Sequence, residues 1–151
     1  MTNFRPGGFA VLPTVVKNLL IINVLFFLAT IAAQSVFRID LADYLGLHYI
    51  GASDFQPFQL VTYMFMHGSF AHLFFNMFAL WMFGNTLENI WGANRFLLFY
   101  FVCGIGAGLV QELVQYIQYA TTLQAYTSVN MGGHIVPEYL NLLTTVGASG
   151  A

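Results

Sequence analysis

Three long apolar runs constrain the fold of this chain more than any other feature of its sequence. They cover residues 15–33, 68–87 and 96–114. A helix of about 20 apolar residues spans the hydrocarbon core of a bilayer. The sequence therefore predicts an all-α fold, a polytopic membrane helix bundle with three full transmembrane helices. Residues 142–151 are predicted to begin a fourth helix.

The composition excludes most soluble classes of protein. Of the 151 residues, 58% are hydrophobic and 7% are charged, whereas about a quarter of the residues of a soluble domain are charged. The lipid bilayer is thus the expected partner, and the net charge of −2 gives no basic surface for nucleic acid. The single cysteine, Cys103, is predicted to pack rather than react. No CxxC or HExxH pattern occurs, so we expect neither a metal nor a cofactor.

The segments between and after the runs carry weaker signals. Thr14 is a plausible cap for the first helix, and residues 37–66 indicate broken amphipathic structure in the membrane interface, where His48 has no assigned role. Residues 88–95 are predicted to form a tight polar turn. The glycines of residues 104–108 predict a close helix contact, and the third helix is expected to extend to about residue 120.

Three hydrogen-bonding side chains lie where the second apolar run begins. His72 and Asn76 are four residues apart, so a helix places them on one face. His67 is five residues before His72 and is expected in the entering loop. Such groups cost free energy in a membrane unless they are paired or functional. Capping and solvation would explain one of them, but the convergence of three indicates a site.

The positions of the basic residues predict the orientation. With three spans and a cytoplasmic N-terminus, Arg5, Lys17 and Arg95 lie inside and Arg38 lies outside. This agrees with the positive-inside bias of membrane proteins. The loop that carries His67 and the segment after the third span then share the outer face.

Taken together, the polar motifs resemble those of the rhomboid intramembrane serine proteases. The resemblance rests on three patterns: His67-x4-His72-x3-Asn76, the Gly-x3-Glu-x3-Gly pattern of residues 84–92, and Gly-Ala-Ser-Gly at residues 147–150. It covers the chain from about residue 57 to its end. Where rhomboids often carry Trp-Arg, this chain has Phe58-Gln59, which makes the structure of that loop an open question.

The resemblance implies a six-helix bundle that cleaves transmembrane segments of membrane-protein substrates near the outer interface. Ser149 is then the nucleophile, His72 and Asn76 contribute to the oxyanion hole, and His67 supports the site. In the family the base is a histidine on the sixth helix. Residues 1–151 are therefore expected to be a C-terminally incomplete rhomboid-like domain, proteolytically inactive alone, since an unactivated hydroxyl is a weak nucleophile.

Two other functions are compatible with the same residues. A non-catalytic rhomboid-like protein would bind transmembrane helices without cutting them, although such a protein needs neither Ser149 nor the His72 and Asn76 pair. A small metal or haem protein would use His67 and His72, but no third ligand stands at a recognisable spacing. The expected location is a bacterial inner membrane, with the N-terminus in the cytoplasm.

Overall fold

The computed structural model describes residues 11–118, 120 and 144–147. The first long helix, α1 (Thr14–Ala32), continues into a π-helical segment, η1 (Ala33–Phe37). The second is built from α4 (Phe70–Ala79), the π-helical segment η3 (Leu80–Gly84) and α5 (Asn85–Trp91), which follow one another without a break. The third is α6 (Ala93–Gln118). Helices thus form where the three apolar runs predict them.

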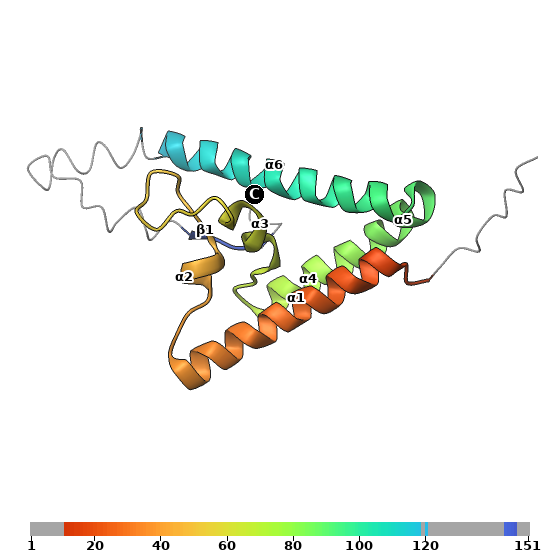
Figure 1. The fold of residues 1–151 in the computed structure, drawn as a ribbon, viewed down its shortest axis with the longest axis horizontal. Helices are drawn as coiled ribbons and strands as arrows, with labels where there is room; N and C mark the ends of the chain where they lie inside the picture. The colour runs from red at the N-terminus through yellow and green to blue at the C-terminus, as the bar shows by residue number, and fades with distance from the viewer. Residues whose placement is uncertain (1–10, 119, 121–143, 148–151) are drawn as a thin grey trace, which may run out of the picture.

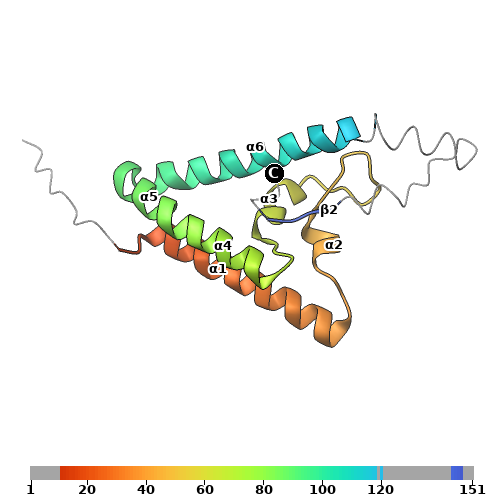
Figure 2. The same ribbon diagram turned by 180° about the vertical axis from the view of Figure 1, so that it is seen from behind.

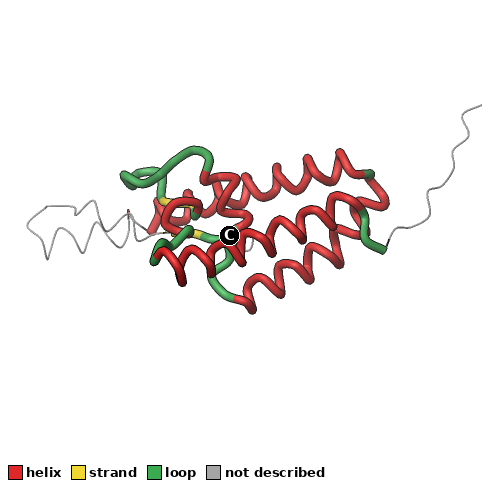
Figure 3. The backbone as a smooth tube through the Cα atoms, turned by 60° about the horizontal axis from the view of Figure 1, so that its bottom comes forward, coloured by secondary structure: helices red, strands yellow, loops and turns green. Residues whose placement is uncertain are grey.

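These long helices form a V, as Figure 1 shows. α1 and α4 lie side by side, and α6 diverges from them after the α5–α6 junction. The wide end of the V holds the short elements, in both Figure 1 and the reverse view of Figure 2. They are α2 (Ala42–Leu45), β1 (Leu47–His48), α3 (Gln59–Thr62), the 3-10 segment η2 (Tyr63–Phe65) and β2 (Thr144–Thr145). Loops therefore gather at one end of the bundle (Figure 3).

The outward faces of the helices are apolar. Two segments are long and apolar enough to cross a membrane, Thr14–Phe37 and Ala93–Gln118. Leu25 on α1 and Phe75 on α4 are 58% and 67% exposed, and many other large apolar side chains are exposed as well. Water would disfavour so much apolar surface, whereas lipid tails would cover it. The described helices therefore have the surface of a membrane protein.

The core lies where α1, η2 and α6 meet. Its buried apolar side chains come from α1, β1, η2 and α6: Val16, Leu19, Leu47, Tyr63, Met64, Phe65 and Phe96. On α1, Val16, Leu19 and Asn23 recur at helical spacing, so a single face of this helix is buried. The Tyr63 hydroxyl donates to the Gly104 carbonyl. The segment that leads to His67 is thus fastened directly to α6.

The prediction of a turn at residues 88–95 is wrong, and the contacts of Glu88 explain why. Residues 88–91 remain helical within α5, and the turn is reduced to Gly92, whose φ of +82° favours glycine. The buried Glu88 carboxylate accepts hydrogen bonds from the backbone N–H groups of Val15 and Val16, at 2.9 and 2.8 Å. These are unpaired donors of the first turn of α1, and the helix dipole also favours an anion there. Glu88 therefore caps α1 from another helix, while Thr14 is the first helical residue and makes no side-chain cap.

Replacing Glu88 with glutamine is expected to lower the free energy of unfolding by about 2 kcal/mol, because a charged acceptor of two buried N–H groups is lost. The measurement is thermal or denaturant unfolding in detergent. Asp43→Asn is the matched control, because this carboxylate is exposed and surface substitutions change stability by about 0.5 kcal/mol or less. Equal effects of the two variants would contradict the capping role.

The glycine strip on α6 makes close contacts, as predicted, but with a different kind of partner. Met64 packs against Gly104, and Tyr63 with Leu47 packs against Gly108; a Cβ at either glycine would meet these side chains. The partners thus belong to η2 and β1 rather than to a second long helix. A Cβ at Gly106 would meet no atom within 4 Å. The small residues of α6 make room for the site-bearing segment.

The end of the described chain also differs from the sequence prediction. Thr144 and Thr145 form a strand, β2, and do not belong to a fourth helix. β2 pairs antiparallel with β1, with Leu47 opposite Thr145 and His48 opposite Thr144. The partner strand is about 100 residues away in the chain, so local sequence carries no signal for this pairing.

Candidate functional site

The start of α4 positions His72 and Asn76. Ser69 is the N-cap residue, with extended backbone, and its hydroxyl accepts a hydrogen bond from the His72 N–H at 3.1 Å. The cap sets the first turn of the helix. His72 and Asn76 then lie one turn apart, both half-buried, and their predicted common face is confirmed by their place in α4.

His67 lies in the loop between η2 and α4, as predicted, and contacts both other polar residues. Its Nδ1 is 3.2 Å from the Phe65 carbonyl oxygen, and its Nε2 is 3.1 Å from the Asn76 side-chain nitrogen. A carbonyl can only accept, so Nδ1 carries the proton and Nε2 accepts from the Asn76 amide. The His67 and His72 rings meet edge to face, with centroids 5.1 Å apart.

Burial disfavours the charged form of His67. The ring is 4% exposed, and desolvation lowers the pKa of His67 below that of a free histidine. The Phe65 carbonyl raises this pKa, while the charge of a protonated His72 would lower it further. A neutral ring is the form that the hydrogen bond with Asn76 requires. His67 therefore fixes the orientation of the Asn76 amide, whose nitrogen has a second N–H to donate.

Gly147 brings the end of the described chain to His72. A Cβ on Gly147 would lie 2.6 Å from two atoms of the His72 ring, and the φ of +83° also favours glycine. The Gly147 N–H donates to the Tyr63 carbonyl at 2.8 Å. Together with the β1–β2 pairing, these contacts hold residues 144–147 against the loop and the helix that carry His67 and His72.

The structure brings three of the four predicted site residues together. His67, His72 and Asn76 form one cluster, and Gly147 of the Gly-Ala-Ser-Gly motif touches it. Ser149 lies outside the described residues, as do His134 and Arg5, with which the orientation was predicted.

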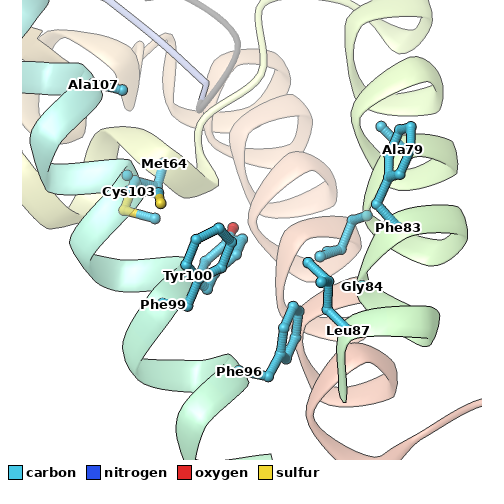
Figure 4. A pocket seen from close by; sticks show the side chains of 12 residues that line it. Met64, Ala79, Phe83, Gly84, Leu87, Phe96, Phe99, Tyr100, Cys103 and Ala107 are labelled. Carbon is cyan, nitrogen blue, oxygen red and sulfur yellow. The ribbon is translucent and has the colours of Figure 1, made fainter. Parts of the chain in front are cut away.

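One cavity borders the cluster, and a second shares part of its lining. His67 and Asn76 line one of about 200 Å³, together with Asn23, Met64 and Tyr100 among others. A larger cleft of about 330 Å³ runs between α6 and the α4–α5 stretch. In Figure 4, Phe96 and Tyr100 of α6 stand across this cleft from Phe83 and Leu87. Cys103 is exposed along the cleft, although the sequence predicts a packed residue.

Gln59 is a structural residue whose role was not predicted from the sequence. It is buried at the place where rhomboids often carry Trp-Arg. Its Oε1 accepts from the backbone N–H groups of His48 and Gln56, and its Nε2 donates to the Tyr44 and Asp54 carbonyls and to His48 Nδ1. A neutral amide thus ties the loop of residues 44–59 together. The departure from the family pattern at Phe58-Gln59 was the feature of the sequence that could have pointed to this role. His48, predicted to be interfacial, is instead buried beside β2.

The hydrogen bonds of His67 bear on the alternative function, in which His67 and His72 would ligate a metal or haem. Both ring nitrogens are engaged, Nδ1 with Phe65 and Nε2 with Asn76, so neither has a lone pair to offer a metal. Within residues 11–118, 120 and 144–147, no three His, Cys, Asp or Glu side chains gather where they could hold a metal ion. Within the cluster, His67 donates through Nδ1 and accepts at Nε2, and the Asn76 amide has a second N–H to donate.

Comparisons with known proteins identify the family of this chain. The sequence model of the rhomboid domain family matches residues 54–151. Rhomboid protease GluP of Bacillus subtilis (strain 168) is 45% identical over 47 residues, which are 31% of this chain and 9% of GluP. YdcA of the same organism, also named as a rhomboid protease, is 31% identical over 68 residues, 45% of this chain and 32% of YdcA. The matches thus span about a tenth and a third of these relatives. The family match covers well over half of the chain, which therefore belongs to the rhomboid family and is an integral membrane protein.

Proposed function

We propose that this chain is the N-terminal part of an intramembrane serine protease that cleaves transmembrane segments of membrane-protein substrates. The observation that carries the proposal is the contact of Gly147 with His72, beside the hydrogen-bonded pair of His67 and Asn76. Ser149 follows Gly147 by two residues, which an extended chain spans with at most about 7 Å. The length of the chain therefore allows the proposed nucleophile to reach this cluster.

Each residue has a defined role in this proposal. Ser149 Oγ attacks the carbonyl carbon of the scissile bond, and its proton passes to the histidine expected on the sixth helix. The carbonyl oxygen becomes an oxyanion, to which the Asn76 amide and the His72 ring donate hydrogen bonds. A preorganised donor of this kind is worth about 3 kcal/mol of transition-state stabilisation. His67 is a positioning residue, because it acts through Asn76.

The proposed membrane arrangement has three spans and a cytoplasmic N-terminus, in a bacterial inner membrane. The second span is the continuous helix from Phe70 to Trp91, whose beginning carries the site. The start of α1 and the α5–α6 junction lie at one end of the bundle, and the short elements lie at the other (Figure 1). This arrangement supports the proposal that Arg95 and Asp54 lie on opposite sides of the membrane, as the parity of three spans requires.

Cysteine labelling tests this orientation. Single cysteines at positions 54 and 95, both exposed, are introduced in a Cys103→Ala background. An impermeant thiol reagent is added outside intact inner-membrane vesicles of known sidedness. It should label position 54 in vesicles that expose the outer face of the membrane, and position 95 in vesicles that expose the cytoplasmic face. The reverse pattern would overturn the orientation without affecting the assignment of the site.

Cleavage tests the function. The protein with all six expected helices is reconstituted with a single-span test substrate, and the products are mapped by mass spectrometry. We expect one cut close to the outer interface. A substrate that is bound but stays intact would instead identify a helix-binding rhomboid-like protein.

A further inference from the structure

Two buried polar side chains on α6 hold the short elements at the wide end of the bundle. Glu112 and Gln115 are 8% and 4% exposed and lie three residues apart, on one face of the helix. Glu112 Oε2 accepts a hydrogen bond from the Ile50 N–H at 2.7 Å. Gln115 Nε2 donates to the Thr145 hydroxyl at 3.2 Å. α6 therefore binds the residues just after β1 and the strand β2 through two neighbouring side chains.

Each of these side chains also has an oxygen without a partner: the second carboxyl oxygen of Glu112 and the amide oxygen of Gln115. Glu112 Oε1 and Gln115 Oε1 are buried, and in the described part of the chain neither makes a hydrogen bond. A carboxylate oxygen and an amide oxygen are both acceptors, so they cannot satisfy each other. A buried acceptor left unpaired costs about 1–3 kcal/mol, and more if it is charged.

Among the residues that the structure describes, few offer positive charge to a carboxylate at this place. The titratable groups on the segments around this part of α6 are Tyr116 on α6, Tyr63 in η2, His48 in β1, and Tyr49 with Asp54 after β1. Among these only His48 can become cationic, and its Nδ1 is engaged with Gln59. Arg95 is on α6 itself but 17 residues away, which is about 25 Å along a helix.

We propose that Glu112 carries a proton in the folded protein and, through Gln115 and Thr145, positions the strand that leads to Ser149. The protonated Oε1 becomes a donor to the Gln115 oxygen, one helical turn away. A continuous chain of hydrogen bonds then runs from the Ile50 N–H to Glu112, on to Gln115 and finally to Thr145. One proton thus satisfies both unpaired oxygens. That the network matters for catalysis rests on the proposed function, whereas the network itself does not depend on that function.

The proton gives the site region a dependence on pH. Below the pH at which Glu112 ionises, the network is closed and β2 is fastened to α6. As the pH rises through that point, the proton is lost and both oxygens are again buried acceptors without a partner. β2 and the residues after β1 should then open more often, which loosens the attachment of Gly147 at His72.

Amide hydrogen exchange tests the proposal without a proteolytic assay. The chain in detergent is compared with the variants Glu112→Gln, Gln115→Ala and Gln118→Ala at a series of pH values, in peptides that contain residues 47–50 and 144–147. In Glu112→Gln the new amide N–H replaces the acid proton, so protection should persist at all pH values. The natural chain should match this variant at acidic pH and exchange about tenfold faster than it at alkaline pH, the effect expected for one buried hydrogen bond.

The other two variants are a matched pair. Gln115→Ala should exchange faster at every pH, because it removes the link to Thr145. Gln118 is an exposed glutamine one turn further along α6, and Gln118→Ala should behave like the natural chain. Comparison at the same pH cancels the intrinsic pH dependence of exchange.

Two outcomes would overturn the proposal. If Glu112→Gln exchanges faster than the natural chain at every pH, the fold requires the carboxylate charge and not the proton. If Gln115→Ala exchanges like Gln118→Ala, the network does not position β2. In contrast, the expected exchange pattern together with an absence of cleavage would leave the network in place and reject only the proteolytic function.

Discussion

Replacing Ser149 with alanine is expected to abolish cleavage, with a loss of turnover of about 10⁴-fold or more. The hydroxyl is the proposed nucleophile, and without it no acyl-enzyme can form. The experiment uses the protein with all six expected helices, and measures cleavage of the test substrate and the melting temperature on the same samples. The melting temperature should remain close to that of the natural protein, because the change removes a single oxygen atom.

Ser69→Ala is the control for this experiment. Ser69 is a second serine near the site, and its hydroxyl caps α4 by accepting from the His72 N–H. Its loss should lower stability by about 1 kcal/mol while leaving measurable turnover. If Ser149→Ala still cleaves, or if both serine variants lose activity in proportion to their stability, Ser149 is not the nucleophile.

The second large effect concerns the two proposed oxyanion donors. His72→Ala and Asn76→Ala should each reduce kcat by about 10²-fold or somewhat less, since the backbone N–H of Ser149 remains as a donor. Substrate binding should change far less, because the negative charge develops only in the transition state. The measurement is a set of kcat and KM values together with melting temperatures.

Replacing an asparagine far from the site is the control that distinguishes a loss of catalysis from a loss of folding. Asn18 is exposed on α1, so Asn18→Ala should leave both kcat and the melting temperature unchanged. His67→Ala should reduce kcat through Asn76, and its effect should not add to that of Asn76→Ala, because the two side chains form one hydrogen bond. Full activity of Asn76→Ala, or a loss of activity only in step with unfolding, would refute the oxyanion assignment.

The parts of this fold that depend on local sequence were predictable. The apolar runs place all three long helices, and the spacing of His72 and Asn76 places both on α4. The failures share a physical cause, which is contact between distant residues. Glu88 caps α1 across 73 positions, so residues that looked like a polar turn remain helical. In the same way, Gln59 and His48 are buried because a loop folds around them, and hydrophobic periodicity does not record such contacts.

For the candidate site, the sequence motif identified the side chains but not their pairing. His67 was assigned to the entering loop with a supporting role, and the structure shows that its ring is hydrogen-bonded to the Asn76 amide. The contact between Gly147 and the His72 ring required the strand pairing of β1 with β2, and no local pattern predicted it.

The pairing of β1 with β2 has a consequence for the order of folding. It closes a loop of roughly 100 residues, and the entropy lost on closure must be offset by contacts that form only when both ends have met. Interactions so distant in sequence tend to form late. The contacts of α1 with α4 and of α5 with α6 join segments closer in the chain, so they can assemble first. Gly147 should therefore reach His72 only after the helices have packed, and on heating this contact should be among the first to be lost.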